Sequence, residues 1–284
     1  MHRGTPPQQF ARALASISDQ TLRPRELVVV EDGPLDREHH EVIHGFALEG
    51  TRVTVVRLRS NGGPGVANQA GLMSASSTWI AKADADDVCL PGRFRAQLDA
   101  LSASGSDLCG SAMLEFDGAE DNVVAIRRAP TTHADILRRV RLNNPINHPT
   151  AMYRREAAMA AGGYPDWRFA EDYALVARML SNGARMMNLA EPLVLFRAGD
   201  SQVSRRRSSE VRGGELRLQQ ALRDLRLVST PRMVANLGLR VGFTILPARL
   251  AGTVARRVLA SPVRDSETGQ RFPHMSEPEG RTGQ

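Results

Sequence analysis

Cysteine and lysine are almost absent from this chain of 284 residues, which has two cysteines and a single lysine, Lys82. The cysteines, Cys89 and Cys109, are too few for a disulfide framework or a cysteine-rich metal site, so we expect buried thiols in a reducing cytosol. No apolar run approaches the ~18 residues of a membrane span. Met1–Gln9 also lacks the apolar segment of a signal peptide. These absences predict a cytoplasmic protein.

Charge is distributed unevenly along the chain, whose formal net charge is +6. Residues 205–264 contain thirteen arginines and three acidic residues, whereas residues 1–200 are slightly acidic. This basic extension predicts an anionic partner. We expect an anionic membrane surface rather than nucleic acid, because the extension has no recognised nucleic-acid-binding motif and few aromatic residues among its arginines. The alternative is a helical bracket that packs on the main domain and keeps its arginines in solvent.

The first hundred residues alternate between apolar, β-branched runs and amphipathic segments. This alternation predicts an α/β fold with a mostly parallel sheet and helices on both faces. The continuous apolar run Leu27–Val30 is typical of a buried parallel strand. We expect further strands at Val53–Leu58 and Thr78–Ala83, and helices at Phe10–Ser18, Glu38–Glu49, Val66–Ala75 and Arg93–Leu101.

Beyond Leu101 the pattern changes to a hairpin and shorter elements. The hairpin strands are expected at Asp107–Phe116 and Asn122–Arg127. We predict one domain over residues 1–204, a basic helical extension over 205–262 and a disordered tail over 263–284. The other expected elements are helices at Thr132–Arg141, Arg155–Ala161, Asp172–Ser181, 211–227, 231–246 and 248–260, and strands at Thr150–Arg154 and Leu193–Arg197.

Three carboxylates, Asp84, Asp86 and Asp87, lie within four residues directly after the predicted strand Thr78–Ala83. A buried, unpaired charge is costly, and the carboxyl end of a strand is where α/β proteins bind ligands. Mg²⁺ and Mn²⁺ take oxygen ligands, often one or two carboxylates together with phosphate oxygens. The cluster therefore predicts a site for Mn²⁺ or Mg²⁺ that carries a diphosphate, with a solvated acidic loop as the alternative.

Other candidate residues also lie at the ends of predicted elements. Asp32 follows the strand Leu27–Val30, where it caps the Gly33-Pro34 turn or accepts a hydrogen bond from a ligand. The run Asn61-Gly62-Gly63-Pro64-Gly65 opens a helix and lets a phosphate approach the backbone, although a plain strand-to-helix turn fits equally well. Asp172 begins a helix, where the helix dipole and free N–H groups stabilise a carboxylate, so a simple N-cap is the alternative.

Six short motifs follow one another in a characteristic order: Glu31-Asp32-Gly33-Pro34, Asn61-Gly62-Gly63-Pro64-Gly65, Asp84-Ala85-Asp86-Asp87 with Leu90-Pro91, Asn147-His148-Pro149, Gly162-Gly163-Tyr164 and Ala170-Glu171-Asp172. Over residues 5–205 the chain resembles family-2 glycosyltransferases of the GT-A fold, and among them the exopolysaccharide branch typified by amylovoran-biosynthesis enzymes. The resemblance implies metal-dependent, inverting transfer of a sugar from a nucleotide-sugar, UDP- or dTDP-linked, to a saccharide or lipid-linked saccharide acceptor.

The resemblance also implies roles for individual side chains. Asp86 is the direct metal ligand, assisted by Asp84, which also holds the ribose or a metal-bound water. Asp172 is the general base that deprotonates the acceptor hydroxyl, with Glu171 as the alternate. An in-line attack with one base and one metal inverts the anomeric carbon without a covalent intermediate. The residues expected to bind the nucleotide-sugar are Asp32, Asn61, Gly65, Asp84 and His148.

The chain departs from the family pattern in two places. Such enzymes begin with an apolar central strand, and no run of this kind precedes Phe10–Ser18, so we expect a sheet that lacks its first strand. We favour a start several residues upstream, because the remaining motifs are intact. A non-catalytic nucleotide-sugar-binding protein or a truncated inactive form is the competing hypothesis. A late histidine that the family sometimes uses as a third metal ligand is also missing near Phe196–Asp200.

A sugar-phosphate nucleotidyltransferase is a further hypothesis from the same fold neighbourhood. That class needs a glycine-rich start of the type Gly-X-Gly-Thr-Arg with a lysine downstream, and the sequence contains no such start. We therefore set this hypothesis aside in favour of the glycosyltransferase.

Overall fold

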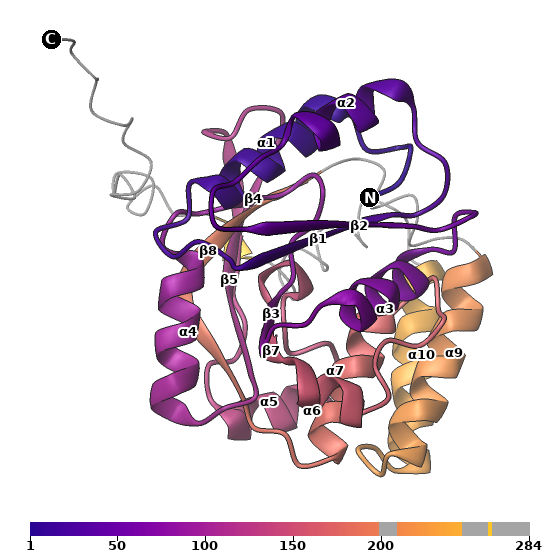
Figure 1. Ribbon diagram of the computed structural model, residues 1–284. Helices are drawn as coiled ribbons and strands as arrows, with labels where there is room; N and C mark the ends of the chain where they lie inside the picture. The colour runs from indigo at the N-terminus through magenta and orange to yellow at the C-terminus, as the bar shows by residue number, and fades with distance from the viewer. Residues whose placement is uncertain (199–208, 246–260, 263–284) are drawn as a thin grey trace, which may run out of the picture.

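Two β-sheets and the helices around them organise the chain in the computed structural model, which describes residues 1–198, 209–245 and 261–262 (Figure 1). One sheet has two strands and the other has seven. Helices cover both sheets, so the predicted α/β class is confirmed. Among the described helices, none is both long and apolar enough to cross a membrane.

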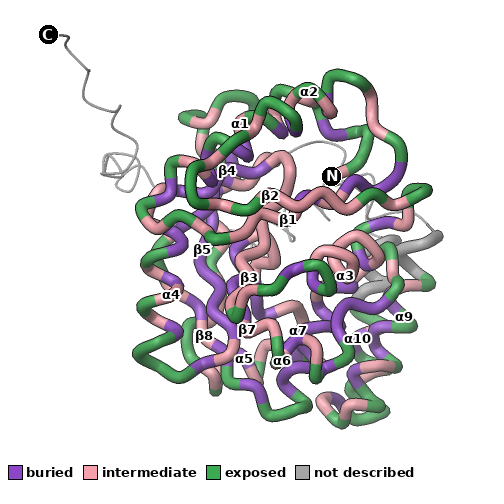
Figure 2. The backbone as a smooth tube through the Cα atoms, viewed as in Figure 1, coloured by how far each residue is buried: buried purple, intermediate pink, exposed green. Residues whose placement is uncertain are grey.

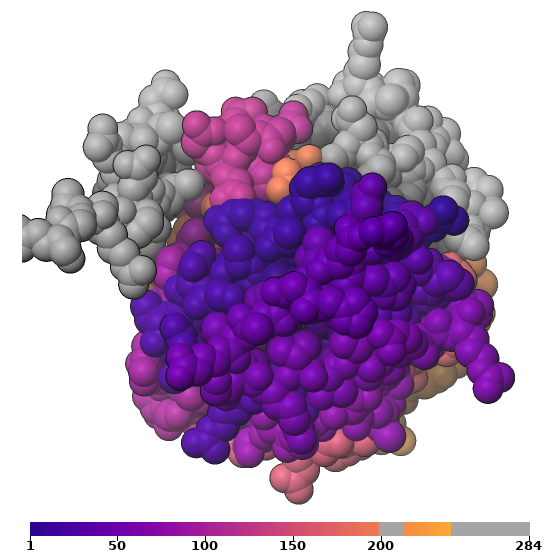
Figure 3. All heavy atoms as spheres, turned by 45° about the horizontal axis from the view of Figure 1, so that its top comes forward, coloured from indigo at the N-terminus to yellow at the C-terminus, as the bar shows by residue number. Residues whose placement is uncertain are grey.

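The two-stranded sheet pairs β1 (Glu26–Glu31) with β2 (Arg52–Arg57) in parallel, as the sequence predicts. In Figure 1, α1 (Pro7–Ser18) and α2 (Arg37–Gly45) cover one face, and α3 (Pro64–Ser74) lies on the other. In Figure 3 these N-terminal elements, in indigo and purple, form most of the face turned to the viewer. The buried cluster on the α1–α2 side contains Phe10, Leu14, Val29 and Ile43.

The seven-stranded sheet is mixed, because most of its strands come from the part of the chain beyond Leu101, where the sequence pattern changes to a hairpin and shorter elements. Its central strand, β5 (Leu108–Phe116), is parallel to β8 (Met186–Arg197) but antiparallel to β6 and β7. A short hairpin turn joins β5 to β6, and a hairpin is antiparallel by geometry. The other strands are β3 (Trp79–Ala81), β4 (Val88–Cys89), β6 (Val123–Arg127), β7 (Met152–Arg154) and β9 (Ser261–Pro262).

No strand among the described residues joins the two sheets. β1 pairs only with β2, and β3 pairs only with β7, so each has one edge without a strand partner in this part of the chain. Met1 lies against the second edge of β1. Its amino group donates to the Val30 carbonyl oxygen at 2.9 Å, and its carbonyl oxygen accepts from the Asp32 N–H at 2.7 Å. The separation of the sheets agrees with the expected lack of a first central strand.

Burial differs between the sheets (Figure 2). Eight of the nine residues of β5 are buried, against two of the six in β1 and none of the three in β3. In a complete parallel sheet with helices on both faces, central strands are buried on both sides. The apolar side chains of β1 and β3 therefore keep partial contact with solvent along their unpaired edges.

The remaining helices surround the larger sheet and share one large core. α7 (Glu171–Ser181) is its best-buried helix, and α9 (Ser209–Asp224) inserts Leu218 and Leu222 into the same core. The described part of the basic extension thus packs on the main domain, as the bracket alternative requires. The predicted helix at 248–260 and the tail at 263–284 lie outside the described residues. The other helices are α4 (Arg93–Ser104), α5 (His133–Arg139), the 3₁₀-helix η1 (His148–Thr150), α6 (Arg155–Ala160) and α10 (Thr230–Ile245).

Most of the predicted elements in the described residues are present, but two boundaries differ clearly. α2 ends at Gly45 rather than Glu49, because Phe46 adopts extended backbone with φ −82° and ψ 120°. β8 begins at Met186 rather than Leu193, and its register with β5 shifts near Pro192, which hides the strand pattern. β4 and β9 have two residues each, too few to show a period in the sequence.

Candidate functional site

The acidic turn follows β3, as the sequence predicts, and its first carboxylate is paired. Lys82 Nζ donates to Asp84 Oδ1 and also, at 3.1 Å, to the Ala83 carbonyl oxygen. Burial opposes ionisation of Asp84, but the charges of Lys82 and His148 and the Lys82 hydrogen bond together outweigh it and lower the Asp84 pKa. Asp84 is therefore held as a carboxylate that accepts hydrogen bonds or a cation.

Asp86 and Asp87 are crowded against Asp84. Burial, and next the negative charge of Asp84, raise the pKa of Asp86, and the same two effects raise the pKa of Asp87 well above its usual value. Arg197 at the end of β8 holds this turn. Its Nε donates to the Asp86 carbonyl oxygen at 3.2 Å, and its backbone N–H donates to Asp87 Oδ1 at 3.0 Å. A cation at this cluster would favour the ionised carboxylates and offset their mutual repulsion.

The donor atoms of this turn fit a hard divalent cation, but only as a partial ligand set. Within the part of the chain that the structure describes, no three His, Cys, Asp or Glu side chains converge into a metal-binding group. Asp84 and Asp86 provide two carboxylates, and the buried Oδ2 of Asp87 has no hydrogen-bond partner among the described residues. Mg²⁺ usually keeps several waters and uses one or two carboxylates plus substrate phosphates. A bound diphosphate would complete such a set.

Glu171 and Asp172 lie in the first turn of α7, directly after a strained residue. Ala170, the N-cap, has φ 58°, a left-handed conformation that residues with a Cβ rarely adopt. Asp172 Oδ2 accepts a hydrogen bond from Asn144 Nδ2 at 2.8 Å, which orients the carboxylate. Glu171 is only 8% exposed, and burial, reinforced by the charge of Asp172, raises its pKa to about 8. Glu171 is thus mostly a neutral acid at pH 7.

His148 connects the acidic turn with the start of α7. Its Nε2 lies 2.9 Å from the Tyr164 hydroxyl, which lies 3.2 Å from the Tyr153 hydroxyl. Burial lowers the pKa of His148, and the negative charges of Asp172 and Asp84 oppose this shift. One imidazole is therefore within electrostatic reach of both carboxylates, one from the acidic turn and one from the start of α7.

Asp32 clamps the glycine-rich loop. Its Oδ1 accepts from the Gly62 N–H at 2.7 Å, and its Oδ2 accepts from the Gly63 N–H at 3.1 Å. These partners differ from the Gly33-Pro34 turn that the sequence offers as an alternative. A carboxylate oxygen accepts more than one hydrogen bond, so an N–H group of a nucleobase remains compatible with these two contacts.

Asn61 and Gly65 contact the segment that leads to α7. Arg168 donates from Nη1 to Asn61 Oδ1 at 3.1 Å and from Nη2 to the Asn61 carbonyl oxygen at 2.8 Å. The Gly65 N–H donates to the Trp167 carbonyl oxygen at 3.2 Å, and a Cβ at Gly65 would collide with backbone atoms of Pro165 and Trp167. Glycine at this position thus permits close packing between two protein segments, and the loop is joined to the α7 side of the site.

Four polar residues, Lys82, Asn144, Arg168 and Arg197, support the candidate site residues, although none of them is assigned a role from the sequence. Lys82 has a local signal, because its position two residues before Asp84 places its charge beside the acidic cluster. The other three lie 28, 107 and 111 residues from their partners, so only the tertiary fold brings them there.

The sequence profile described as glycosyl transferase family 2 matches residues 6–162, more than half of the chain. The chain therefore belongs to glycosyl transferase family 2 and is a glycosyltransferase, as the motifs predict.

Curated relatives agree with this assignment. The chain is 34% identical over 202 residues to the amylovoran biosynthesis glycosyltransferase AmsE of Erwinia amylovora, a match that covers 71% of this chain and 75% of the relative. It is 31% identical over 245 residues to an uncharacterized glycosyltransferase of Haemophilus influenzae, covering 86% and 91%. It is 26% identical over 254 residues to the UDP-Gal:alpha-D-GlcNAc-diphosphoundecaprenol beta-1,3-galactosyltransferase of Escherichia coli, covering 89% and 92%.

Solved structures share the fold at low sequence identity. TarS 1–349 of S. aureus in complex with UDP superposes with a TM-score of 0.62 at 16% identity, covering 95% of this chain and 76% of that chain. Another TarS structure gives a TM-score of 0.63, and the match spans 43% of that chain. The mannosyltransferase PcManGT of Pyrobaculum calidifontis, in complex with GDP-Man and Mn²⁺, gives a TM-score of 0.57 at 16% identity, covering 90% and 78%. These likenesses establish the GT-A fold.

Proposed function

We propose that this glycosyltransferase moves a sugar from a nucleotide-sugar, UDP- or dTDP-linked, to a saccharide or lipid-linked saccharide acceptor, with inversion at the anomeric carbon. The observation that carries the proposal is that one buried imidazole, His148, lies within electrostatic reach of both Asp84 in the acidic turn and Asp172 at the start of α7. The names of the E. amylovora and E. coli relatives support a place in exopolysaccharide or cell-surface glycan synthesis.

The acidic turn is assigned to the donor side. Asp86, assisted by Asp84, would hold Mn²⁺ or Mg²⁺, and such an ion, when bound, neutralises the charge that develops on the leaving nucleoside diphosphate. Asp32 would accept a hydrogen bond from the imide N–H of uracil or thymine while it clamps the glycine-rich loop. Neighbours of the same fold that contain UDP, or GDP-Man with Mn²⁺, support a nucleotide-sugar donor and a divalent cation.

The start of α7 is assigned to the acceptor side. Asp172 takes the proton of the acceptor hydroxyl as that oxygen attacks the anomeric carbon. The new carbon–oxygen bond forms while the bond to the phosphate oxygen breaks, and its electron pair leaves with the nucleoside diphosphate. Asn144 holds Asp172 through its amide donor. Glu171, with a pKa raised to about 8, retains its proton at pH 7 and is the alternate base at higher pH.

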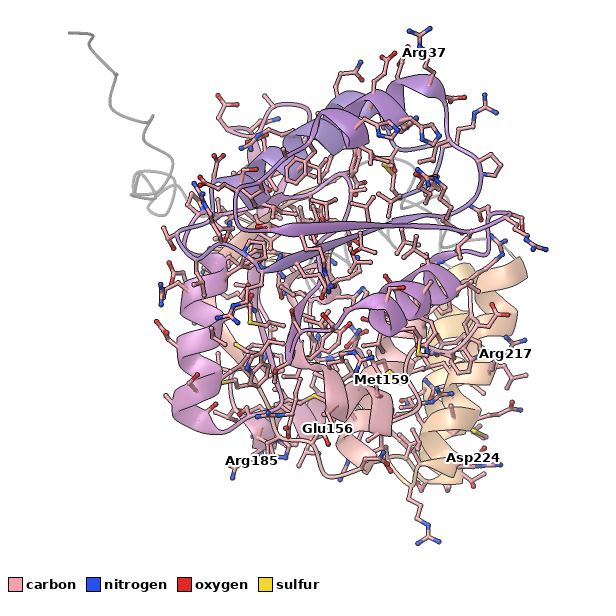
Figure 4. All side chains as sticks on the ribbon, viewed as in Figure 1. Arg37, Glu156, Met159, Arg185, Arg217 and Asp224 are labelled. Carbon is pink, nitrogen blue, oxygen red and sulfur yellow. The ribbon has the colours of Figure 1, made fainter. Side chains whose placement is uncertain are left out.

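The outward face of α9 and α10 is assigned to an anionic membrane surface, where a lipid-linked acceptor would be found. Leu216, Val234 and Leu239 are 45%, 60% and 59% exposed, and Arg226 and Arg232 are exposed near them in the sequence. Figure 4 labels Arg217 and Asp224 on α9; the Arg217 guanidinium lies 5.7 Å from the centre of the Trp167 ring, whereas Asp224 lies at the exposed end of the helix. Apolar and basic side chains together suit anionic head groups. The protein should therefore cosediment with phosphatidylglycerol vesicles and should not cosediment with phosphatidylcholine vesicles.

Calorimetric titration of the purified chain with UDP, dTDP and GDP, each with and without Mn²⁺, tests the donor side. We expect one nucleotide to bind in a Mn²⁺-dependent manner, and Asp86→Ala to abolish that dependence. Asp135→Ala, which removes an exposed carboxylate from α5, is the control and should bind like the wild type. Equal binding by the Asp86→Ala variant would contradict the assignment of the metal site.

A non-catalytic nucleotide-sugar-binding protein is the second candidate, favoured by the separation of the two sheets at β1 and β3. The two candidates differ in turnover. An enzyme transfers the sugar of the donor to an acceptor or to water, and its Asp172→Asn variant should lose this activity but keep its nucleotide affinity. A folded wild type that binds no nucleotide, but gains binding when an apolar strand is fused ahead of Met1, would favour an inactive form of the same fold.

A further inference from the structure

Arg93, the first residue of α4, is fully buried and contacts both turns of the site. Its Nη2 donates to the Lys82 carbonyl oxygen at 2.7 Å, directly before the acidic turn. The same Nη2 lies 3.4 Å from the Ala151 carbonyl oxygen, which follows the His148 turn and also accepts from the Lys82 N–H at 2.8 Å. One guanidinium therefore links two segments that are far apart in sequence.

Gln97, one helical turn further along α4, extends this contact. Its Oε1 accepts from Arg93 Nε at 3.0 Å, which fixes the guanidinium plane. Its Nε2 donates to the Thr150 carbonyl oxygen at 2.7 Å and to the Cys109 carbonyl oxygen at 2.8 Å. Both side chains have 0% exposure. Together they tie the acidic turn, η1 and the central strand β5 to one helix.

The charge of Arg93 has no carboxylate partner in an ion pair among the described residues, and its neighbours are neutral. Nη1 donates to Cys89 Sγ at 3.1 Å, and Cζ lies 5.6 Å from the centre of the Phe94 ring. Burial of an unpaired cation is costly, and an apolar side chain often serves a core better than a buried charge does. Stability alone therefore does not explain Arg93, whereas its Nη2, which contacts two carbonyl oxygens, fixes how the segments that carry them lie relative to each other.

We propose that Arg93 is a positioning residue that sets the acidic turn against the His148 turn, so that Asp84, Asp86 and His148 meet the same diphosphate. This inference rests on the proposed nucleotide-sugar site. Arg93 touches neither the donor nor the metal, and it acts through the Lys82 and Ala151 carbonyl oxygens. Outer-shell partners of this kind orient metal ligands, and their loss typically lowers metal affinity by about 10–100-fold.

The test compares Arg93→Met and Arg93→Lys with Leu101→Ala. Leu101 lies on the same helix, is 1% exposed and takes no part in the hydrogen bonds to the two turns, so we expect its truncation to destabilise α4 while those hydrogen bonds remain. The affinity of UDP with Mn²⁺ is measured well below each variant's melting temperature. We expect Arg93→Met to weaken binding by about 10–100-fold, Arg93→Lys to restore part of it, and Leu101→Ala to bind like the wild type.

Hydrogen exchange without any ligand gives the second measurement. Amides of residues 82–87 and 148–151 should exchange faster in Arg93→Met than in Leu101→Ala. Equal affinity in all variants, or equal exchange at both turns, would overturn the role of Arg93. If the wild type binds none of the nucleotides, the proposed donor site is wrong, and the exchange comparison still decides whether Arg93 orders the two turns.

Discussion

The two sheets differ in how fully they are covered, and the two sides of the site divide between them. β5 in the larger sheet is buried along almost its whole length, whereas β1 in the small sheet is mostly half-buried (Figure 2). Asp32, Asn61 and Gly65, which we assign to the nucleotide, follow β1 and β2. Asp172, which we assign to the base, begins α7, the best-buried helix on the larger sheet, whereas Asp86, which we assign to the metal, follows the half-buried strand β3.

This division suggests that the base at the start of α7 is held more rigidly than the residues that we assign to the nucleotide. Groups on well-packed elements keep their geometry, as catalysis requires. Segments with fewer buried contacts open locally at a lower free energy, as binding segments often do. The contacts of Arg168 with Asn61 and of Gly65 with Trp167 join the two sides, so that a nucleotide held by the small sheet would also be positioned against α7.

Loss of the base should have the largest effect, and this effect should be on turnover alone. We expect Asp172→Asn to lower turnover by about 10²–10⁴-fold, because the acceptor hydroxyl keeps its proton. The affinity for the nucleotide should be unchanged, since Asp172 contacts the acceptor side. Asp135→Asn makes the same change in the first turn of α5 and should leave turnover intact. Full turnover by Asp172→Asn would transfer the role of base to Glu171, to be tested with Glu171→Gln.

The same substitution in each sheet should separate their contributions to stability. Val194 in β8 is 1% exposed, whereas Val28 in β1 is half-buried. Val194→Ala should lower the free energy of unfolding by about 2–3 kcal/mol, and Val28→Ala by only about 1 kcal/mol, because less apolar surface is lost from the core. Urea unfolding of both variants measures the difference. Equal losses would mean that the small sheet is as well packed as the large one.

Sequence reasoning predicts the elements and motifs of this chain well, because both are local. The strands β1 and β2, the β5–β6 hairpin and the helix start at Asp172 all follow from periodicity and from end residues. The lack of a central strand is also visible in the sequence. Local patterns do not reveal the mixed sheet, because pairing β3 with β7 joins residues that are distant in the chain.

The supporting contacts of the site are less predictable for a physical reason. Arg93 opens a predicted helix, and a charged residue at such a place is nearly always on the surface, so its burial cannot be read from the sequence. The partner of Asp32 is a loop thirty residues away rather than the adjacent turn. Residue types thus predict where chemistry occurs, whereas the fold decides which polar groups orient it.

The stability of the protein as a function of pH should test the environment of Glu171 at the start of α7. Burial raises the Glu171 pKa from 4.5 to about 8, so the folded protein keeps a proton that the unfolded chain releases within this range. The free energy of unfolding should therefore fall as pH rises from 4.5 to 8. Glu171→Gln has no titrating group there, and its stability relative to the wild type should grow by roughly 2 kcal/mol between pH 5 and pH 7. A difference independent of pH would place Glu171 in solvent contact.

Substitutions at the nucleotide-binding residues of the small sheet should have a weaker effect, and the effect should be on binding affinity rather than on turnover. Asp32→Asn leaves one acceptor oxygen for the two N–H groups of Gly62 and Gly63 and turns an amide donor toward one of them. We expect the affinity for UDP with Mn²⁺ to fall about tenfold, with a smaller change in turnover at saturating donor. Glu26→Gln is the matched control, because Glu26 accepts from the Ser76 N–H at 2.8 Å at the opposite end of β1. If both variants weaken binding equally, the loss reflects general loosening of the small sheet, and Asp32 has no specific part in holding the nucleotide.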